Sequence, residues 1–192
     1  MQERQQRTSV VDERVEIMTG LVHIYTGDGK GKTTAALGLG LRACGRGMKV
    51  LMVQFLKGAP TGEMYSLKAL EPGFVLRRGT ETKKFTWEMN AEEKAQTAAE
   101  QRCIFNDTIR MVSGNEWDLL ILDEALGAIS SGMLDKNAVI AFIKGKPEKL
   151  ELVLTGRGAT PELIELADYV SEIKAVKHPV DRGVNGRKGI EF

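Results

Sequence analysis

Residues 26–33, with the sequence TGDGKGKT, form a glycine-rich segment between a short apolar stretch and a stretch with helical spacing. The apolar stretch Leu21–Tyr25 predicts a β-strand, and Thr33–Cys44 predicts a helix that ends at Gly45 or Gly47. In a strand–loop–helix unit of this kind, successive backbone N–H groups and the positive end of the helix dipole bind phosphate. The segment therefore predicts a phosphate-binding loop within an α/β fold.

Each residue type in this loop suits phosphate binding. Three glycines permit a sharp backbone and the close approach of a phosphate: Gly27, Gly29 and Gly31. Lys32 supplies a positive charge to the phosphates, and the Thr33 hydroxyl group suits Mg²⁺. Thr26 stands where the usual pattern begins with glycine, which predicts a tighter loop than that of ordinary P-loop NTPases. The alternative, a glycine-rich turn with incidental lysines, does not account for Gly-Lys-Thr at the start of a helix.

The rest of the chain alternates predicted strands with predicted helices. Five further strands are predicted: Val50–Phe55, Phe74–Arg77, Leu119–Asp123, Leu150–Thr155 and Tyr169–Lys174. Further helices are predicted at Met64–Leu70, from Asn90 to about Met111, at Lys136–Lys144 and at Pro161–Ala167. Asn90 and Glu93 have the spacing of a capping box, and Thr160 precedes a proline suited to the first helical position. This order predicts a mostly parallel sheet with helices on both faces.

The composition fits one compact domain. The chain has 192 residues, of which 21–192 are expected to form the domain. The polar residues 1–20 are expected to be a tail or a short helix that orders on a partner. Lys+Arg 27 against Asp+Glu 26 gives a net charge of +1, so no basic field points to nucleic acid as a partner.

Cellular location can also be predicted from the sequence. No apolar run approaches the roughly 18 residues that a membrane helix needs, and the first residues lack the apolar core of a signal peptide. The two cysteines, Cys44 and Cys103, are far apart and form no CxxC pair. A reducing cytoplasm is therefore the expected location.

A second candidate site element is the pair of carboxylates that ends the strand Leu119–Asp123. Asp123 and Glu124 follow four apolar residues, and the strand end is expected to lie beside the phosphate loop. One of these carboxylates is expected to hold Mg²⁺, directly or through water, together with Thr33. The sequence does not decide between Asp123 and Glu124.

Three other polar residues have more than one interpretation. Arg157 follows a predicted strand in Thr155-Gly-Arg-Gly158, where it is either a triphosphate ligand or a solvated loop arginine. His23 lies inside the first strand and is expected to be a packed histidine rather than a base. The role of His178, near the C-terminus, is open. The chain has no Asn-Lys-x-Asp sequence, so guanine recognition of the small G-protein kind is not expected.

Phe85 and Trp87 are two large aromatic residues in an otherwise polar segment. In an extended segment, residues two apart face the same side. The pair is therefore either a set of core anchors or one wall of a pocket for a large flat ligand.

Several short motifs, in chain order, resemble the ATP:corrinoid adenosyltransferases of the CobA/BtuR type. They are Thr26-Gly-Asp-Gly-Lys-Gly-Lys-Thr-Thr-Ala-Ala36, Val53-Gln-Phe-Leu-Lys-Gly58 with Gly62-Glu63, Phe85-Thr-Trp87, Leu122-Asp-Glu124, Thr155-Gly-Arg-Gly158 and Val176-Lys-His178. The resemblance runs from about Leu21 to the C-terminus. Other P-loop proteins share the loop, whereas its combination with Phe-Thr-Trp and Thr-Gly-Arg-Gly is far more specific.

The resemblance implies a RecA-like P-loop fold, a homodimer, and transfer of the 5′-deoxyadenosyl group of ATP to Co(I) of a corrinoid, which leaves triphosphate. It implies ATP held in a reversed sense, Mg²⁺ or Mn²⁺ as cofactor, an electron-donating reductase as partner, and residues 1–20 as a lid over the corrinoid. The implied catalytic residues are Lys32, Thr33 and Glu124. The implied ATP ligands are Thr26, Gly27, Asp28, Gly29, Lys30, Gly31, Lys32, Thr33, Thr34, Glu63 and Arg157. The implied corrinoid ligands are Phe85 and Trp87, which would displace the lower axial ligand.

Co(I) is itself a strong nucleophile, so this reaction needs neither a protein nucleophile nor a general base. The protein needs to align cobalt with C5′ and to stabilise the leaving triphosphate. Two alternatives remain on the same loop: a RecA-like ATPase acting as a motor or switch, and a non-catalytic nucleotide-binding module.

Overall fold

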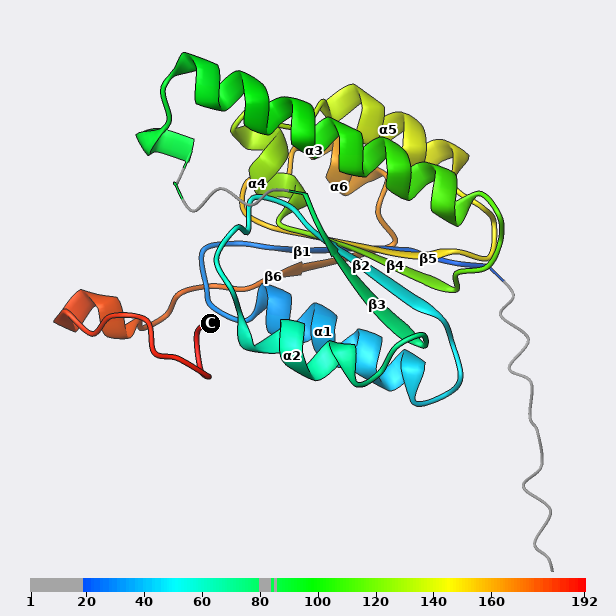
Figure 1. The fold of residues 1–192 in the computed structure, drawn as a ribbon, viewed down its shortest axis with the longest axis horizontal. Helices are drawn as coiled ribbons and strands as arrows, with labels where there is room; N and C mark the ends of the chain where they lie inside the picture. The colour runs from blue at the N-terminus through cyan, green and yellow to red at the C-terminus, as the bar shows by residue number, and fades with distance from the viewer. Residues whose placement is uncertain (1–18, 80–83, 85) are drawn as a thin grey trace, which may run out of the picture.

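Six parallel strands form a single sheet in the computed structural model, which describes residues 19–79, 84 and 86–192 (Figure 1). The strands are β1 (Val22–Thr26), β2 (Val50–Gln54), β3 (Phe74–Arg78), β4 (Leu119–Asp123), β5 (Glu151–Thr155) and β6 (Tyr169–Glu172). Their order across the sheet is β3-β2-β4-β5-β1-β6. The prediction of a parallel sheet is confirmed.

Helices cover both faces of this sheet, as the alternating pattern predicts. They are α1 (Lys32–Cys44), α2 (Gly62–Lys68), α3 (Ala91–Val112), α4 (Ala125–Ser130), α5 (Lys136–Gly145) and α6 (Pro161–Glu165). Figure 1 shows α1 and α2 on one face and the other four helices on the opposite face. Two short 3₁₀ helices are η1 (Thr86–Glu88) and η2 (Pro179–Arg182).

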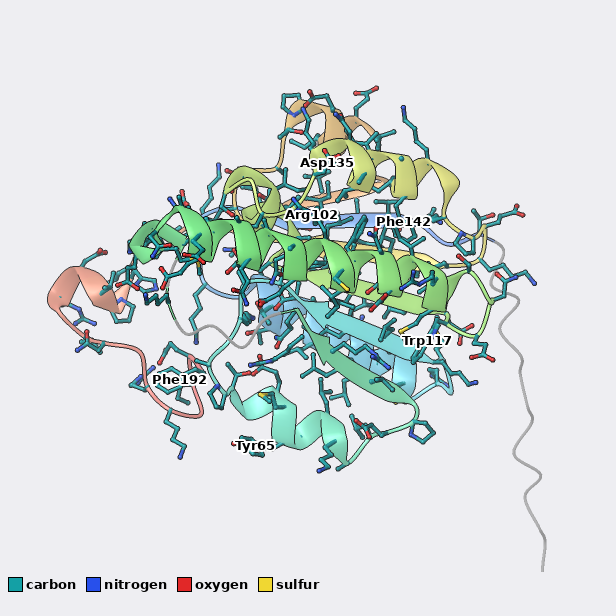
Figure 2. All side chains as sticks on the ribbon, turned by 45° about the horizontal axis from the view of Figure 1, so that its top comes forward. Tyr65, Arg102, Trp117, Asp135, Phe142 and Phe192 are labelled. Carbon is teal, nitrogen blue, oxygen red and sulfur yellow. The ribbon has the colours of Figure 1, made fainter. Side chains whose placement is uncertain are left out.

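Each face of the sheet has its own hydrophobic core. On the α3 face, Phe105 packs between Phe55 and Phe142, with ring centroids 6.5 and 5.9 Å away, respectively. Figure 2 shows Phe142 on α5 beside α3, whereas Tyr65 on α2 projects into solvent. On the α1 face, the smaller core contains Ala36 and Phe74. These two cores bury β2 and β4 completely, so the loops at their ends start from fixed positions.

Local sequence signals set several helix starts. The Asn90 side chain accepts a hydrogen bond from the Glu93 N–H at 2.9 Å, and the Glu93 carboxylate accepts one from the Asn90 N–H at 3.0 Å. This confirms the predicted capping box at the start of α3. Pro161 is the first residue of α6, but the side chain of Thr160 makes no capping hydrogen bond.

The order of the strands decides which loops meet. Strands β1 and β4 are not neighbours, because β5 lies between them and pairs with both. Since the sheet is parallel, all strands end at one edge, which is where α/β proteins bind ligands. No helix in the described part of the chain is long and apolar enough to cross a membrane.

Candidate functional site

The phosphate loop connects β1 to α1. Thr26 is the last residue of β1, and the first left-handed residue is Gly27, with φ of 101°. A threonine fits at residue 26 because extended backbone accepts any side chain. A β-carbon at Gly27 or Gly29 would lie 2.5 or 2.7 Å from the carbonyl oxygen of Ile173. That carbonyl accepts a hydrogen bond from the Gly29 N–H at 2.7 Å, so the segment after β6 braces the loop.

Lys32 lies over the loop that precedes it. Its ammonium group donates hydrogen bonds to the carbonyls of Gly27, at 2.6 Å, and Gly29, at 2.8 Å. Burial, and then the charge of Arg157, lower the pKa of Lys32 from its ordinary value. The first turn of α1 contains Thr34 and no acidic residue, so the positive end of the helix dipole is not neutralised within that turn. The loop therefore offers a positive charge and a helix start to an anion.

The fully buried carboxylate of Asp123 is surrounded by donors. One oxygen accepts hydrogen bonds from the hydroxyls of Thr33, at 2.9 Å, and Thr155, at 2.6 Å. The other accepts from Gln54 Nε2 at 3.2 Å and from Lys57 Nζ at 2.6 Å. The predicted meeting of Thr33 with an acid at the end of β4 is confirmed, and that acid is Asp123.

Glu124 has a different environment from Asp123. Its backbone is left-handed, with φ of 61°, and its N–H donates to the Thr155 hydroxyl at 3.0 Å. Burial, and then the neighbouring Asp123, raise the pKa of the Glu124 carboxyl. Thr33 hydrogen-bonds to Asp123 in this structure, so the two predicted carboxylates contribute differently to the site.

A second polar cluster extends from Asp123 towards the edge strand β3. Gln54 Nε2 also donates to the Glu63 carboxylate at 2.9 Å, and Arg78 Nε donates to Gln54 Oε1 at 2.9 Å. Burial raises the pKa of Glu63, but hydrogen bonds, first of all from Gln54, outweigh it, and the net shift is downward. Gln54 therefore links Glu63 to Asp123, since its amide nitrogen hydrogen-bonds to both carboxylates.

Four residues of this site were given no role from the sequence, although the quoted motifs contain the first three of them: Gln54, Lys57, Thr155 and Arg78. All of them lie at or just after the carboxyl ends of β2, β3 and β5. Gln54 is directly opposite Asp123 in the register between β2 and β4. The sequence showed that each of these residues lies near the end of a predicted strand. It did not show the order of the strands, which decides which strand ends lie side by side.

Arg157 lies against the phosphate loop on the side of β6. Its Nε is 3.4 Å from the Asp28 carboxylate, and most of its side chain is exposed. A pocket of about 360 Å³ opens here and is lined by Thr26, Gly27, Asp28, Arg157, Gly158, Ala159, Ile164, Val170 and Glu172. Lys30 projects elsewhere, since its ammonium group is 3.5 Å from the carboxylate of Glu191. The position of Arg157 beside the loop fits a triphosphate ligand, and its exposure also fits the alternative of a solvated loop arginine.

Trp87 lies in η1 and is 74% exposed, so its interpretation as a core anchor is wrong. Because Thr86–Glu88 is a 3₁₀ helix, the expectation based on an extended segment is also wrong there. Phe85 and residues 1–18 of the predicted lid (residues 1–20) lie outside the described residues. Trp87 is accessible to a ligand.

The two histidines have local structural partners. His23 Nε2 is 2.5 Å from the Glu151 carboxylate, and its ring stacks on Tyr169 with centroids 4.5 Å apart. This agrees with the expected packed histidine. His178 Nδ1 accepts a hydrogen bond from the Val180 N–H at 3.2 Å and caps η2.

Comparison with known proteins agrees with the motifs. The model of the family described as "ATP:corrinoid adenosyltransferase BtuR/CobO/CobP" matches residues 18–192. This chain belongs to that family. The family resemblance predicted from the sequence is thereby confirmed, and so is an α/β fold of the P-loop type.

Relatives within this adenosyltransferase family match over nearly the full chain. The "Corrinoid adenosyltransferase" of Escherichia coli (strain K12) is 37% identical over 196 residues, covering 100% of this chain and 97% of that protein. "Corrinoid adenosyltransferase CobA" of Salmonella typhimurium (strain LT2) is 38% identical, covering 98% of this chain and 97% of its own. The Pseudomonas aeruginosa "Corrinoid adenosyltransferase" is 36% identical, with coverage of 98% and 93%.

A solved structure shows a related fold outside the adenosyltransferase family. The cytoplasmic domain of EssC superposes with a TM-score of 0.52 at 16% sequence identity, and the match covers 88% of this chain and 34% of that one. At this identity the likeness shows the fold alone.

Proposed function

We propose that this chain transfers the 5′-deoxyadenosyl group of ATP to the Co(I) centre of a corrinoid and releases inorganic triphosphate. It would thus be a cob(I)yrinic acid a,c-diamide or cob(I)alamin adenosyltransferase of adenosylcobalamin synthesis or salvage. The observation that carries the proposal is the family match over residues 18–192, which includes the complete phosphate loop. A cytoplasmic homodimer that receives electrons from a reductase is part of the same proposal.

In this reaction the electron pair of Co(I) attacks C5′ of ATP. The cobalt–carbon bond forms as the C5′–oxygen bond breaks, and the electrons of that bond leave with triphosphate. The chain contributes by placing ATP and by stabilising negative charge on the leaving group. Lys32, the start of α1 and Arg157 support this role, because they surround one side of the loop.

The donor set beside the loop fits a magnesium ion. Thr33, Asp123 and Glu124 offer hard oxygen ligands, and Mg²⁺ is usually bound by one or two carboxylates together with phosphates. Such an ion, or Mn²⁺, supplies positive charge to the triphosphate. Thr33 and Asp123 are already oriented towards each other by their hydrogen bond, which supports their part in this site.

The corrinoid is proposed to lie against Phe85 and Trp87. The exposure of Trp87 supports a ligand-facing role, because a large exposed aromatic side chain is available for contact. There the aromatic residues would displace the lower axial ligand of Co(II), so that the four-coordinate centre is easier to reduce. Residues 1–20 would close over the corrinoid.

Phosphorus NMR of the products of ATP tests this proposal against its alternatives. With reduced corrinoid and Mg²⁺, adenosyl transfer yields inorganic triphosphate. Orthophosphate as the product would instead support a RecA-like ATPase. Unchanged ATP would support a nucleotide-binding module.

A further inference from the structure

Lys57 lies inside the site described above and holds no role in the reaction as proposed. Its ammonium group is 2.6 Å from one carboxylate oxygen of Asp123 and 3.2 Å from the Thr33 hydroxyl oxygen. The side chain is 25% exposed, whereas the Asp123 carboxylate is fully buried. A buried carboxylate needs a compensating charge, and Lys57 supplies it here.

The oxygens that Lys57 contacts are those proposed to hold the metal. Mg²⁺ binds its ligands at about 2.0–2.1 Å and demands near-octahedral geometry. A divalent ion held by Thr33 and Asp123 would lie within a few ångströms of the present position of Lys57 Nζ. Two cations at that separation repel strongly where water is scarce. The ammonium group and the metal therefore compete for the same place.

The backbone on either side of Lys57 has a distinct conformation or is held by hydrogen bonds. The preceding residue, Leu56, is left-handed, with φ of 57°, which is costly for a leucine. Beyond Lys57, the Arg78 guanidinium donates to the carbonyl of Ala59 at 2.6 Å and to the hydroxyl of Thr61 at 2.5 Å. Arg78 thus holds the backbone that follows Lys57.

We propose that Lys57 is a resident cation: its ammonium group occupies the metal position in the ligand-free protein and is displaced when the metal binds. Lys57 is a positioning residue that holds the Asp123 carboxylate and the Thr33 hydroxyl in place before the metal arrives. This inference rests on the metal site of the proposed function, and it concerns metal binding rather than adenosyl transfer.

The first test uses the unaltered full-length protein without nucleotide. Brief acetylation followed by peptide mass spectrometry measures the reactivity of Lys57 in chelator and in saturating Mn²⁺. We expect Mn²⁺ to increase the reactivity of Lys57 several-fold, because the displaced amine loses its contacts with Asp123 and Thr33. The exposed Lys68 on α2 is the internal control and should not change. Equal reactivity of Lys57 in both solutions would overturn the proposal.

The second test compares matched variants by Mn²⁺ titration, read by electron paramagnetic resonance. Lys57→Met removes the competing charge and should tighten the dissociation constant for Mn²⁺ by about ten-fold or more. Lys57→Arg retains a charge and should bind Mn²⁺ as weakly as the wild type, as should the surface control Lys68→Met. Unchanged or weaker Mn²⁺ binding by Lys57→Met would contradict the inference.

A stability measurement covers the case in which Lys57→Met folds poorly. In chelator, the double variant Lys57→Met/Asp123→Asn should have a higher Tm than Lys57→Met, since no buried charge is left uncompensated. Mn²⁺ should raise the Tm of Lys57→Met far more than that of the double variant. Equal responses to Mn²⁺ would overturn the inference. None of these three measurements involves ATP or corrinoid, so a failure of the inference can be distinguished from a failure of the proposed function in the NMR experiment.

Discussion

At the scale of single residues, Lys32 must exchange partners when ATP binds. Its ammonium group now donates to two carbonyls of its own loop, and a phosphate would replace them as the acceptor. Lys32→Ala is expected to lower kcat by about 10²–10³, the usual cost of removing one preorganised donor to a charged transition state. The control is Lys30→Ala, because Lys30 is half exposed and pairs with Glu191, so its loss should cost less. Turnover of Lys32→Ala near the wild-type rate at saturating ATP and Mg²⁺ would refute the assignment.

The raised pKa of Glu124 gives a prediction about stability and pH. Its carboxyl favours folding fully below the ordinary pKa of about 4.3, and this contribution is lost as pH rises through the raised pKa. Glu124→Gln should therefore raise the free energy of unfolding at neutral pH and leave it unchanged below about pH 4. Denaturant unfolding in chelator at both pH values measures this, with the exposed Glu116→Gln as the control. A gain that is independent of pH would contradict the explanation.

Sequence reasoning identified part of the site at this scale. A contact between Thr33 and one of the two acids at the end of β4 was predictable, because parallel strands end at one edge, but the sequence left Asp123 and Glu124 as alternatives. Gln54, Lys57 and Arg78 were not, because their roles depend on β2 lying beside β4 with β3 outside it. Periodicity predicts strands but not the order in which they pair.

At the scale of elements, α1 carries both Lys32 and Thr33, so the packing of α1 against the sheet determines where these two side chains lie. A β-carbon at Gly40 would lie 2.6 Å from the ring of Phe74, whereas one at Gly38 would meet nothing within 4 Å. Gly40→Ala should destabilise the protein by about 1–3 kcal/mol and weaken ATP binding, because α1 must shift. Gly38→Ala, the matched control, should instead stabilise it by about 0.5–1 kcal/mol. Denaturant unfolding and ATP titration of both variants measure these effects, and equal behaviour would contradict the argument.

The 3₁₀ helix η1 exposes Trp87 to solvent. A substitution of Trp87 can therefore test its role at the corrinoid without a large loss of stability. Trp87→Ala should change the free energy of unfolding by less than about 0.5 kcal/mol, as an exposed residue does. It should bind ATP normally and adenosylate corrinoid supplied as Co(I). The defect is expected in the absorption spectrum of Co(II) corrinoid with enzyme and ATP, as a smaller four-coordinate fraction. Wild-type amounts of that species in both Trp87→Ala and Phe85→Ala would rule out the aromatic wall.

Elements with a strong local signal were predicted well. The capping box located the start of α3, and β4 has the predicted bounds. The short helix α4 was missed because it follows directly on a left-handed residue, Glu124, and is too short to show periodicity. The 3₁₀ helix η1 was missed for a related reason, since a single turn leaves no repeat in the sequence.

At the scale of the whole molecule, the site joins the carboxyl ends of β1, β2, β4 and β5. Ligands bound there should therefore stabilise the entire sheet against unfolding. At a hundred-fold excess over Kd, Mg²⁺ with ATP should add about 2.7 kcal/mol and raise Tm by roughly 5–10 °C. Thermal scans with and without chelator measure this, and activity should vanish in chelator and return with Mg²⁺ or Mn²⁺. Full activity in excess chelator would refute the metal site.

The position of β1 within the sheet also has a consequence for synthesis on the ribosome. The first strand to emerge pairs with the last two, so its first partner, β5, is complete only at residue 155 and its second, β6, only at residue 172. At roughly 5–20 residues per second, the nascent strand waits about 6–26 seconds with both edges open before β5 is complete. Chaperones can bind it during this interval. The phosphate loop is braced by the carbonyl of Ile173, so it too is completed only when the last parts of the chain have been made.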